Sequence, residues 1–159
     1  MSYVKIVIGD NRGNRIILPH TTWKAFIERR ANVERLVQST VSSSLTIQDL
    51  IVELVKIGNE YNVKISLNGT CLYMKPKTML FMFELEHCVE HVYFELCQYT
   101  HGISEKFKYF ITFLRQNCIN NQCDAANILH KIYDKNSIIE CELIAYALDN
   151  IVHAALYEK

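Results

Sequence analysis

Glycine and proline are scarce in this chain, which has five glycines and two prolines among its 159 residues. Because flexible or extended linkers are rich in these residues, their scarcity argues against long linkers. No apolar run approaches the roughly 20 residues that a membrane-spanning helix needs. The first residues also lack the charged and apolar regions of a secretory signal. We therefore expect one domain, or two small intimately packed ones, in a soluble intracellular protein of the nucleus or cytoplasm with no membrane partner.

Motifs of catalysis and nucleotide binding are also missing. The chain has no Gly-x-Ser-x-Gly elbow, no phosphate-binding loop and no dinucleotide fingerprint. His87 and His91 have the spacing of paired zinc ligands on a helix, but no third ligand follows in a recognised arrangement. The six cysteines are spread along the chain, which favours free thiols over disulfides. We expect a non-enzymatic protein with neither metal nor cofactor.

The segment 62–75 carries the clearest local signal. Asn68-Gly69 separates two runs of alternating polarity, and this dipeptide suits a type I′ turn because both central residues need positive φ. A two-residue turn sets Lys64 opposite Tyr73 and leaves one face of the hairpin apolar. The other face, with Lys64, Tyr73 and Lys75, is typical of a platform for phosphates and stacked bases. A solvated outer face of an antiparallel sheet has the same pattern.

The order strand, strand, proline, helix occurs twice. The first copy spans residues 4–19 and the second residues 63–76, and each ends on a proline. Proline suits the first turn of a helix, since its φ fits and its missing N–H is not needed there. These units predict an α+β fold with one antiparallel sheet. Duplication and two ordinary hairpins both remain compatible with the pattern.

Several further segments predict helices. Thr21 or Thr22 is expected to cap a helix that carries Trp23. Residues 45–57 combine a capping-box pattern with apolar residues at helical spacing, so we interpret them as a helix. A strand is the alternative, because the segment is rich in β-branched residues. Residues 77–100 predict a helix that is apolar on most sides, and therefore buried in the fold or in a dimer interface.

The last third of the chain predicts only helices, near residues 104–117, 123–134 and 137–157. Small helical extensions of this kind more often complete a core or bind a protein partner than catalyse. We therefore divide the chain into a duplicated strand-strand-helix domain, residues 1–100, and a C-terminal all-helical extension packed on it, residues 101–159.

Charge is distributed unevenly, although the formal net charge is zero. Residues 1–80 hold eleven Lys or Arg and six Asp or Glu, a balance of +5, so the remainder carries −5. An anion-binding half and a protein-facing half would produce this asymmetry.

The segment Arg15–Glu28 resembles the strand-to-helix junction of the positive cofactor 4 family of transcriptional coactivators. A strand that ends in Leu18 is followed by Trp23 and then Phe26 at the spacing of that family. The second unit echoes the pattern with Met74, Met79 or Leu80, and Phe83. The related plant Whirly proteins carry an internally duplicated version of such a unit.

The resemblance implies a curved antiparallel sheet backed by helices, formed as a homodimer, that binds single-stranded DNA. On the matching strands the binding residues would be Lys5, Arg12, Arg15, Lys64, Tyr73 and Lys75. The chain departs from the family because each unit has two predicted strands instead of four, and because the helical tail has no counterpart. We expect a single-stranded DNA-binding or RNA-binding protein of the transcription or replication accessory type. The alternative is a structural or adaptor protein that oligomerises through its apolar helices, with a protein partner at the helical tail.

Overall fold

A computed structural model of the chain describes residues 3–158. The chain divides into two compact units, one formed by Lys5–Tyr93 and the other by residues 94–158 with residues 3 and 4. The strands of the described chain all belong to the first unit, which we call the sheet unit, and we call the other the helical unit. The fold is α+β, with antiparallel sheets and a C-terminal helical region, as the sequence predicts.

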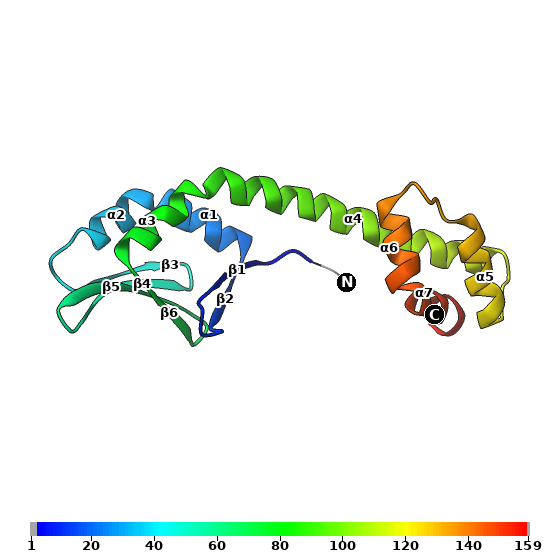
Figure 1. Cartoon of the computed structure of the whole chain (residues 1–159), viewed down its shortest axis with the longest axis horizontal. Helices are drawn as coiled ribbons and strands as arrows, with labels where there is room; N and C mark the ends of the chain where they lie inside the picture. The colour runs from blue at the N-terminus through cyan, green and yellow to red at the C-terminus, as the bar shows by residue number, and fades with distance from the viewer. Residues whose placement is uncertain (1–2, 159) are drawn as a thin grey trace. The chain divides into compact units, whose positions relative to one another are not determined.

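The strands of the sheet unit form two sheets. Its elements are β1 (Ile6–Gly9), β2 (Arg15–Leu18), α1 (His20–Glu28), α2 (Arg30–Val37), β3 (Ser43–Ile47), β4 (Leu50–Ile57), β5 (Glu60–Leu67), β6 (Thr70–Met74), α3 (Pro76–Glu84) and the first turns of α4 (Glu86–Gln116). β1 and β2 form a two-stranded sheet, and β3 to β6 form a four-stranded sheet in sequence order (Figure 1). The prediction of a single sheet is wrong in this respect. β2 lies against β5 and β6 without joining their ladder.

The β5–β6 hairpin has the predicted register, with Lys64 opposite Tyr73 and Leu67 opposite Thr70. Asn68 and Gly69 both have positive φ, at 50° and 81°, as a type I′ turn requires. Most side chains resist this backbone conformation, whereas glycine and asparagine adopt it readily. Local turn chemistry therefore sets this hairpin.

Residues 45–57, interpreted as a helix, form most of β3 and all of β4, so that interpretation is wrong and the strand alternative is correct. Gln48, with a φ of 54°, begins the two-residue turn that joins the two strands. Leu50 and Val52 are buried while Ile51 between them is exposed, which is the alternation of a strand. The apolar residues of this segment also fit a helical period, and it is the pairing with β5 that makes the segment a strand.

One face of the sheets is covered by α1, α2 and α3 (Figure 1). The core between them contains side chains from β2, the four-stranded sheet and the three helices, among them Ile16, Leu18, Trp23, Phe26, Val33, Val52, Val63, Ile65, Leu72, Met79 and Phe83. The rings of Phe26 and Phe83 stack with their centroids 4.6 Å apart. Because both sheets contribute to this one core, the opposite faces of both sheets point away from it.

The helices of the sheet unit begin differently from one another. α1 follows Pro19 and has no side-chain cap, so the predicted cap at Thr21 or Thr22 is wrong. The Thr22 hydroxyl is buried and instead donates to Oε1 of Gln48 at 2.8 Å, which ties α1 to the β3–β4 turn. Pro76 stands in the first turn of α3, as predicted.

The first turns of α4 pack on α1. Nε2 of His20 lies 3.0 Å from Oε1 of Glu90. The His20 ring also stacks on Tyr93, with centroids 4.1 Å apart and planes within 3°. These contacts fix the beginning of α4 to the sheet unit.

The helical unit contains the remainder of α4, then α5 (Gln122–Ile132), α6 (Ile138–Tyr146) and α7 (Leu148–Tyr157). α4 continues through Gly102, so the break predicted there is wrong, as is the single helix over 77–100. The helix predicted over 137–157 is two helices that meet at Ala147. The core of this unit consists of Phe110, Leu114, Ala125, Leu129, Leu143, Ile144, Ile151 and Val152.

Polar side chains also join the helices of this unit. Glu140 is buried at the start of α6, where Oε1 lies 2.7 Å from Nζ of Lys106 and Oε2 accepts from the Asp134 amide at 2.7 Å. The hydrogen bond with Glu140 raises the pKa of Lys106. Arg115 of α4 donates to the carbonyls of Ala154 and Glu158, at 2.8 and 2.6 Å. These contacts tie α6 and α7 to α4.

The segment predicted as an apolar helix over 77–100 is only partly covered by the rest of this chain. The exposed fractions of Phe81, Val92 and Leu96 are 59%, 47% and 46%. Hydrophobicity around a helix predicts burial only where neighbouring elements cover it. None of the helices within residues 3–158 is both long and apolar enough to cross a membrane.

Candidate nucleic-acid interface

The helices α1, α2 and α3 cover one face of the four-stranded sheet and leave the other without a covering helix (Figure 1). Side chains alternate along each strand, so every second residue points to this other side. We call this second side the open face, and it is formed by Ser44, Thr46, Ile51, Glu53, Val55, Ile57, Glu60, Asn62, Lys64, Ser66, Cys71 and Tyr73. Hydroxyl and amide groups are interspersed with a few apolar side chains there. Such a surface presents both hydrogen-bonding groups and flat apolar contact area.

A row of three residues crosses the middle of the open face. Glu53, Lys64 and Tyr73 are neighbours on β4, β5 and β6. Nζ of Lys64 lies 6.0 Å from the centroid of the Tyr73 ring and 4.0 Å from Oε2 of Glu53. The Tyr73 side chain remains 52% exposed. The ring is therefore available for stacking, while Lys64 shares its charge with a carboxylate.

The two-stranded sheet presents a second exposed surface. Ile16 and Leu18 enter the core, and Val7 and Ile17, which pair with each other, face away from it with exposed fractions of 46% and 53%. Arg15 lies on the same side of β2 as Ile17, because the two are separated by one residue.

The turn between β1 and β2 is ordered by its own side chains. The Asp10 carboxylate accepts hydrogen bonds from the amides of Arg12 and Asn14, both at 2.9 Å, and from the Asn14 side chain at 2.8 Å. The Asn14 side-chain bond is the main reason that the pKa of Asp10 lies below its usual value. The carboxylate therefore stays ionised in the turn that carries Arg12.

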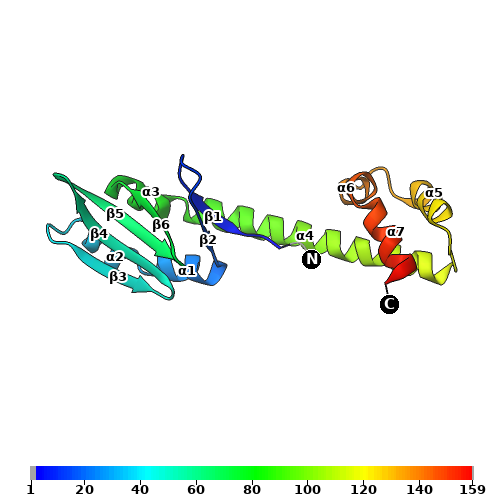
Figure 2. The ribbon, with the colours of Figure 1, turned by 90° about the horizontal axis from the view of Figure 1, so that it is seen from below.

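The β1–β2 hairpin lies beside β6 (Figure 2). A small cleft is formed between residues of β2 and the β5–β6 turn. Its volume is about 170 Å³, and it is lined by Arg15, Ile16, Ile17, Leu67, Asn68 and Thr70. Three of these residues bear polar side chains that come from two hairpins distant in sequence. The cleft thus combines a guanidinium, an amide and a hydroxyl with apolar walls.

The six residues predicted to bind nucleic acid do not form one cluster. Lys64 and Tyr73 are adjacent on the open face, and Lys75 follows β6 as an exposed residue. Arg15 lines the cleft. The other two lie elsewhere on the two-stranded sheet, Arg12 in its turn and Lys5 immediately before β1.

Three residues of this region escaped the sequence analysis: Glu53, Asn68 and Thr70. Glu53 was missed because its segment was interpreted as a helix, and the strand alternative would have set it on the open face. Asn68 and Thr70 were assigned structural roles in the turn. Only the contact between two distant hairpins brings them beside Arg15.

The arginines of α2 have partners of their own. Arg30 donates to Glu34 at 2.8 Å and to Glu84 at 2.9 Å, and these bonds raise its pKa. Its guanidinium also lies 5.6 Å from the Phe83 ring centroid. Arg30 therefore joins α2 to α3 on the helical side of the sheet and does not contribute to the open face.

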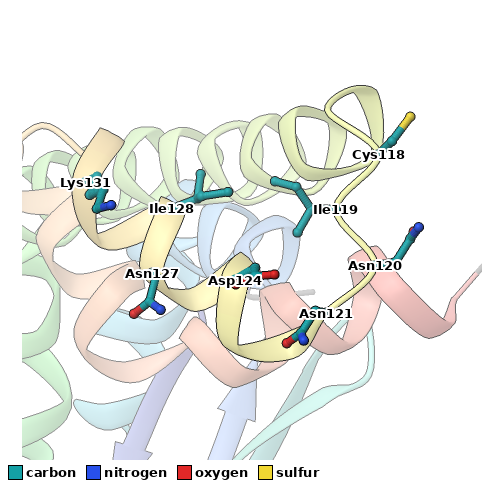
Figure 3. A pocket seen from close by; sticks show the side chains of 8 residues that line it. All are labelled: Cys118, Ile119, Asn120, Asn121, Asp124, Asn127, Ile128 and Lys131. Atoms are coloured by element: carbon teal, nitrogen blue, oxygen red, sulfur yellow. The ribbon is translucent and has the colours of Figure 1, made fainter.

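The helical unit has a larger hollow between the end of α4 and α5, of about 500 Å³ (Figure 3). Ile119 and Ile128 are turned toward each other across it, whereas the Cys118 side chain points outward (Figure 3). The other lining side chains are Asn120, Asn121, Asp124, Asn127 and Lys131. The lining of this hollow contains one acid, one base and several amides around two apolar side chains, and this set does not indicate a particular ligand.

Side chains that could ligate a metal do not gather into a cluster in the part of the chain that the structure describes. No set of three or more His, Cys, Asp or Glu within residues 3–158 is placed to hold a metal ion. The six cysteines are free thiols, as predicted.

No family model, no curated protein and no solved structure matches this chain. The geometry of the sheet unit therefore carries the functional conclusion.

Proposed function

We propose that this chain is a non-enzymatic protein that binds single-stranded nucleic acid across the open face of its four-stranded sheet. The observation that carries the proposal is the pairing of Tyr73 with Lys64. An exposed aromatic ring beside an ammonium group, on an uncovered antiparallel sheet, offers stacking for a base and attraction for the adjoining phosphate. Duplex DNA does not present its base faces to such a surface.

Further basic residues lie after β6 and on the neighbouring two-stranded sheet. Lys75 follows Tyr73 along the chain, and Arg15 and Arg12 lie on the neighbouring two-stranded sheet. Ile51 and Ile17 add exposed apolar area for unstacked bases. Because phosphate contacts release condensed counterions, this binding is expected to weaken as salt rises.

The resemblance to the positive cofactor 4 and Whirly proteins belongs to the same proposal, together with a nuclear or cytoplasmic location. It gains support from the order of β3 to β6 followed by α3, which is four strands and a helix. Met79 and Phe83, two of the residues that echo the family pattern, are buried in the core beneath this sheet.

The test is fluorescence anisotropy with a labelled oligothymidine and a labelled duplex, at about 50 and 200 mM salt. The single strand should bind more tightly than the duplex, and more weakly at the higher salt. Tyr73→Ala should weaken binding by about 1–3 kcal/mol, the usual effect of losing one stacked base. Tyr146→Ala is the matched control, because Tyr146 is an exposed tyrosine on α6, remote in sequence from the sheet. The proposal fails if no oligonucleotide binds at low salt, or if both variants lose affinity equally.

The second function is that of an adaptor which oligomerises through α4. Val92 and Leu96 favour it, since they are four residues apart on one side of this helix and about half exposed. Sedimentation equilibrium of the parent chain and of a Val92→Glu, Leu96→Glu variant tests it. A dimer that dissociates in the variant supports the adaptor, and a monomeric parent chain contradicts it.

A further inference from the structure

The cleft between the β1–β2 hairpin and the β5–β6 turn holds polar groups that the protein itself does not use. Within residues 3–158, the side chains of Arg15, Asn68 and Thr70 make no hydrogen bond or ion pair. A guanidinium has five N–H donors, and the amide and hydroxyl add both donors and acceptors. Three such groups around one cleft are therefore available to a ligand that presents acceptors.

The walls of the cleft restrict what this ligand is. Ile17 and Leu67 line it beside the polar groups. A free anion set against these side chains would lose hydration without full compensation. A planar ring with acceptors on its edge satisfies both kinds of surface, because its faces contact apolar side chains while its edge receives hydrogen bonds.

We propose that this cleft takes one guanine base of the bound single strand, with Arg15 donating to O6 and N7. This proposal rests on the function proposed above. Guanine presents two adjacent acceptors on that edge, which match the paired donors of arginine. Adenine has an amino donor at the corresponding place, and that group would face the guanidinium donors.

The rest of the cleft is suited to hold the base in register. Asn68 sits in a turn whose two central residues both have positive φ, so its backbone is fixed. Thr70 is the first residue of β6, three positions before Tyr73 on the same strand. Side chains three positions apart lie on opposite faces of a strand, so Thr70 is on the core side of the sheet and Tyr73 on the open face. A nucleic-acid strand that stacks one base on Tyr73 would have to pass around the β5–β6 turn to place a further base in the cleft.

The test compares four labelled oligothymidines: one unmodified, and three with a central guanine, adenine or 7-deazaguanine. Guanine should tighten binding by roughly 5- to 150-fold over thymine, the range expected for one bidentate contact. Adenine should give no such gain. 7-Deazaguanine lacks N7 and should give only part of it.

Arg15→Lys tests the contact itself, because lysine keeps the charge but loses the two-pronged geometry. The ratio of guanine to thymine affinity should fall toward one. Asn68→Gly keeps the turn, since glycine accepts positive φ, and should lower the ratio by a smaller factor. Arg35→Lys, on the exposed side of α2, is the matched control and should leave the ratio unchanged. Trp23 fluorescence checks that each variant is folded.

Equal binding of all four oligonucleotides overturns the guanine cleft and leaves the open face as a sequence-independent binder. A guanine preference that persists in Arg15→Lys also overturns it. If no oligonucleotide binds at low salt, the proposed function fails first, so the two failures are distinguishable.

Discussion

In the helical unit the side chains of Lys106 and Arg115 are held by groups on other elements, whereas in the sheet unit the side chains of Arg15 and Lys75 have no hydrogen-bond or ion-pair partner within residues 3–158. The first pair joins helices, and its removal should lower stability. The second pair contributes little to the fold, so its charges are available to an external anion. The contrast concerns these four side chains: two hold helices together, and two leave their charges free for the binding proposed above.

The largest effect expected is loss of the core of the sheet unit in Phe26→Ala. Phe26 is almost fully buried between Trp23 and Phe83, so truncation should lower the unfolding free energy of this unit by about 3–5 kcal/mol. Trp23 is the only tryptophan, and its fluorescence during urea unfolding reports this unit alone. Amide hydrogen exchange in α5 and α7 should be unchanged. Loss of protection in both units together would show that they do not unfold separately.

Glu140→Ala is the corresponding change in the helical unit. The Asp134 amide and Lys106 would lose a buried acceptor, so this unit should be destabilised by about 1–3 kcal/mol. Hydrogen exchange of α6 and α7 measures the loss, and the Trp23 transition should not move. Glu95→Ala removes an exposed acid from α4 and should have little effect. An equal loss in both variants would contradict the role given to Glu140.

A smaller effect is expected for Glu53→Gln on the open face. The Glu53 carboxylate lies near Lys64 and would repel a phosphate bound there. Because exposed ion pairs are worth about 0.2–1 kcal/mol, its removal should tighten oligothymidine binding by no more than about fivefold. Glu28→Gln on α1 removes the same charge from the helix side of the sheet and serves as control. Weaker binding in Glu53→Gln would mean that this carboxylate positions Lys64 and does not compete with phosphate.

The smallest effect is a pH dependence in the helical unit. The pKa of Lys106 is raised above its ordinary 10.5 by the hydrogen bond with Glu140. The stability that this pair contributes is therefore complete below the ordinary pKa and is lost as pH rises through the raised value. Lys106→Met should lower the thermal unfolding temperature at neutral pH, and the difference from the parent chain should shrink above pH 10.5. A difference that stays constant into alkaline pH would contradict the assignment.

Sequence reasoning located what short-range chemistry determines. Asn68-Gly69 defined the β5–β6 hairpin and hence the pairing of Lys64 with Tyr73. Sequence reasoning failed where contacts between segments distant in the chain determine the structure. The segment of β4 fits two periodicities, and only pairing with β5 selects the strand and brings Glu53 beside Lys64. The cleft carries no local signal, because its two sides are separated by about fifty residues of chain.

The strand order of the four-stranded sheet has a consequence for how the sheet unit folds. Each strand pairs with its neighbour in sequence across a two-residue turn, so closing these contacts costs little chain entropy. Contact between β2 and the β5–β6 hairpin instead closes a loop that includes α1, α2, β3 and β4. We therefore expect the meander to form early and the β1–β2 hairpin to dock late, so that the cleft beside Arg15 is among the last features to assemble.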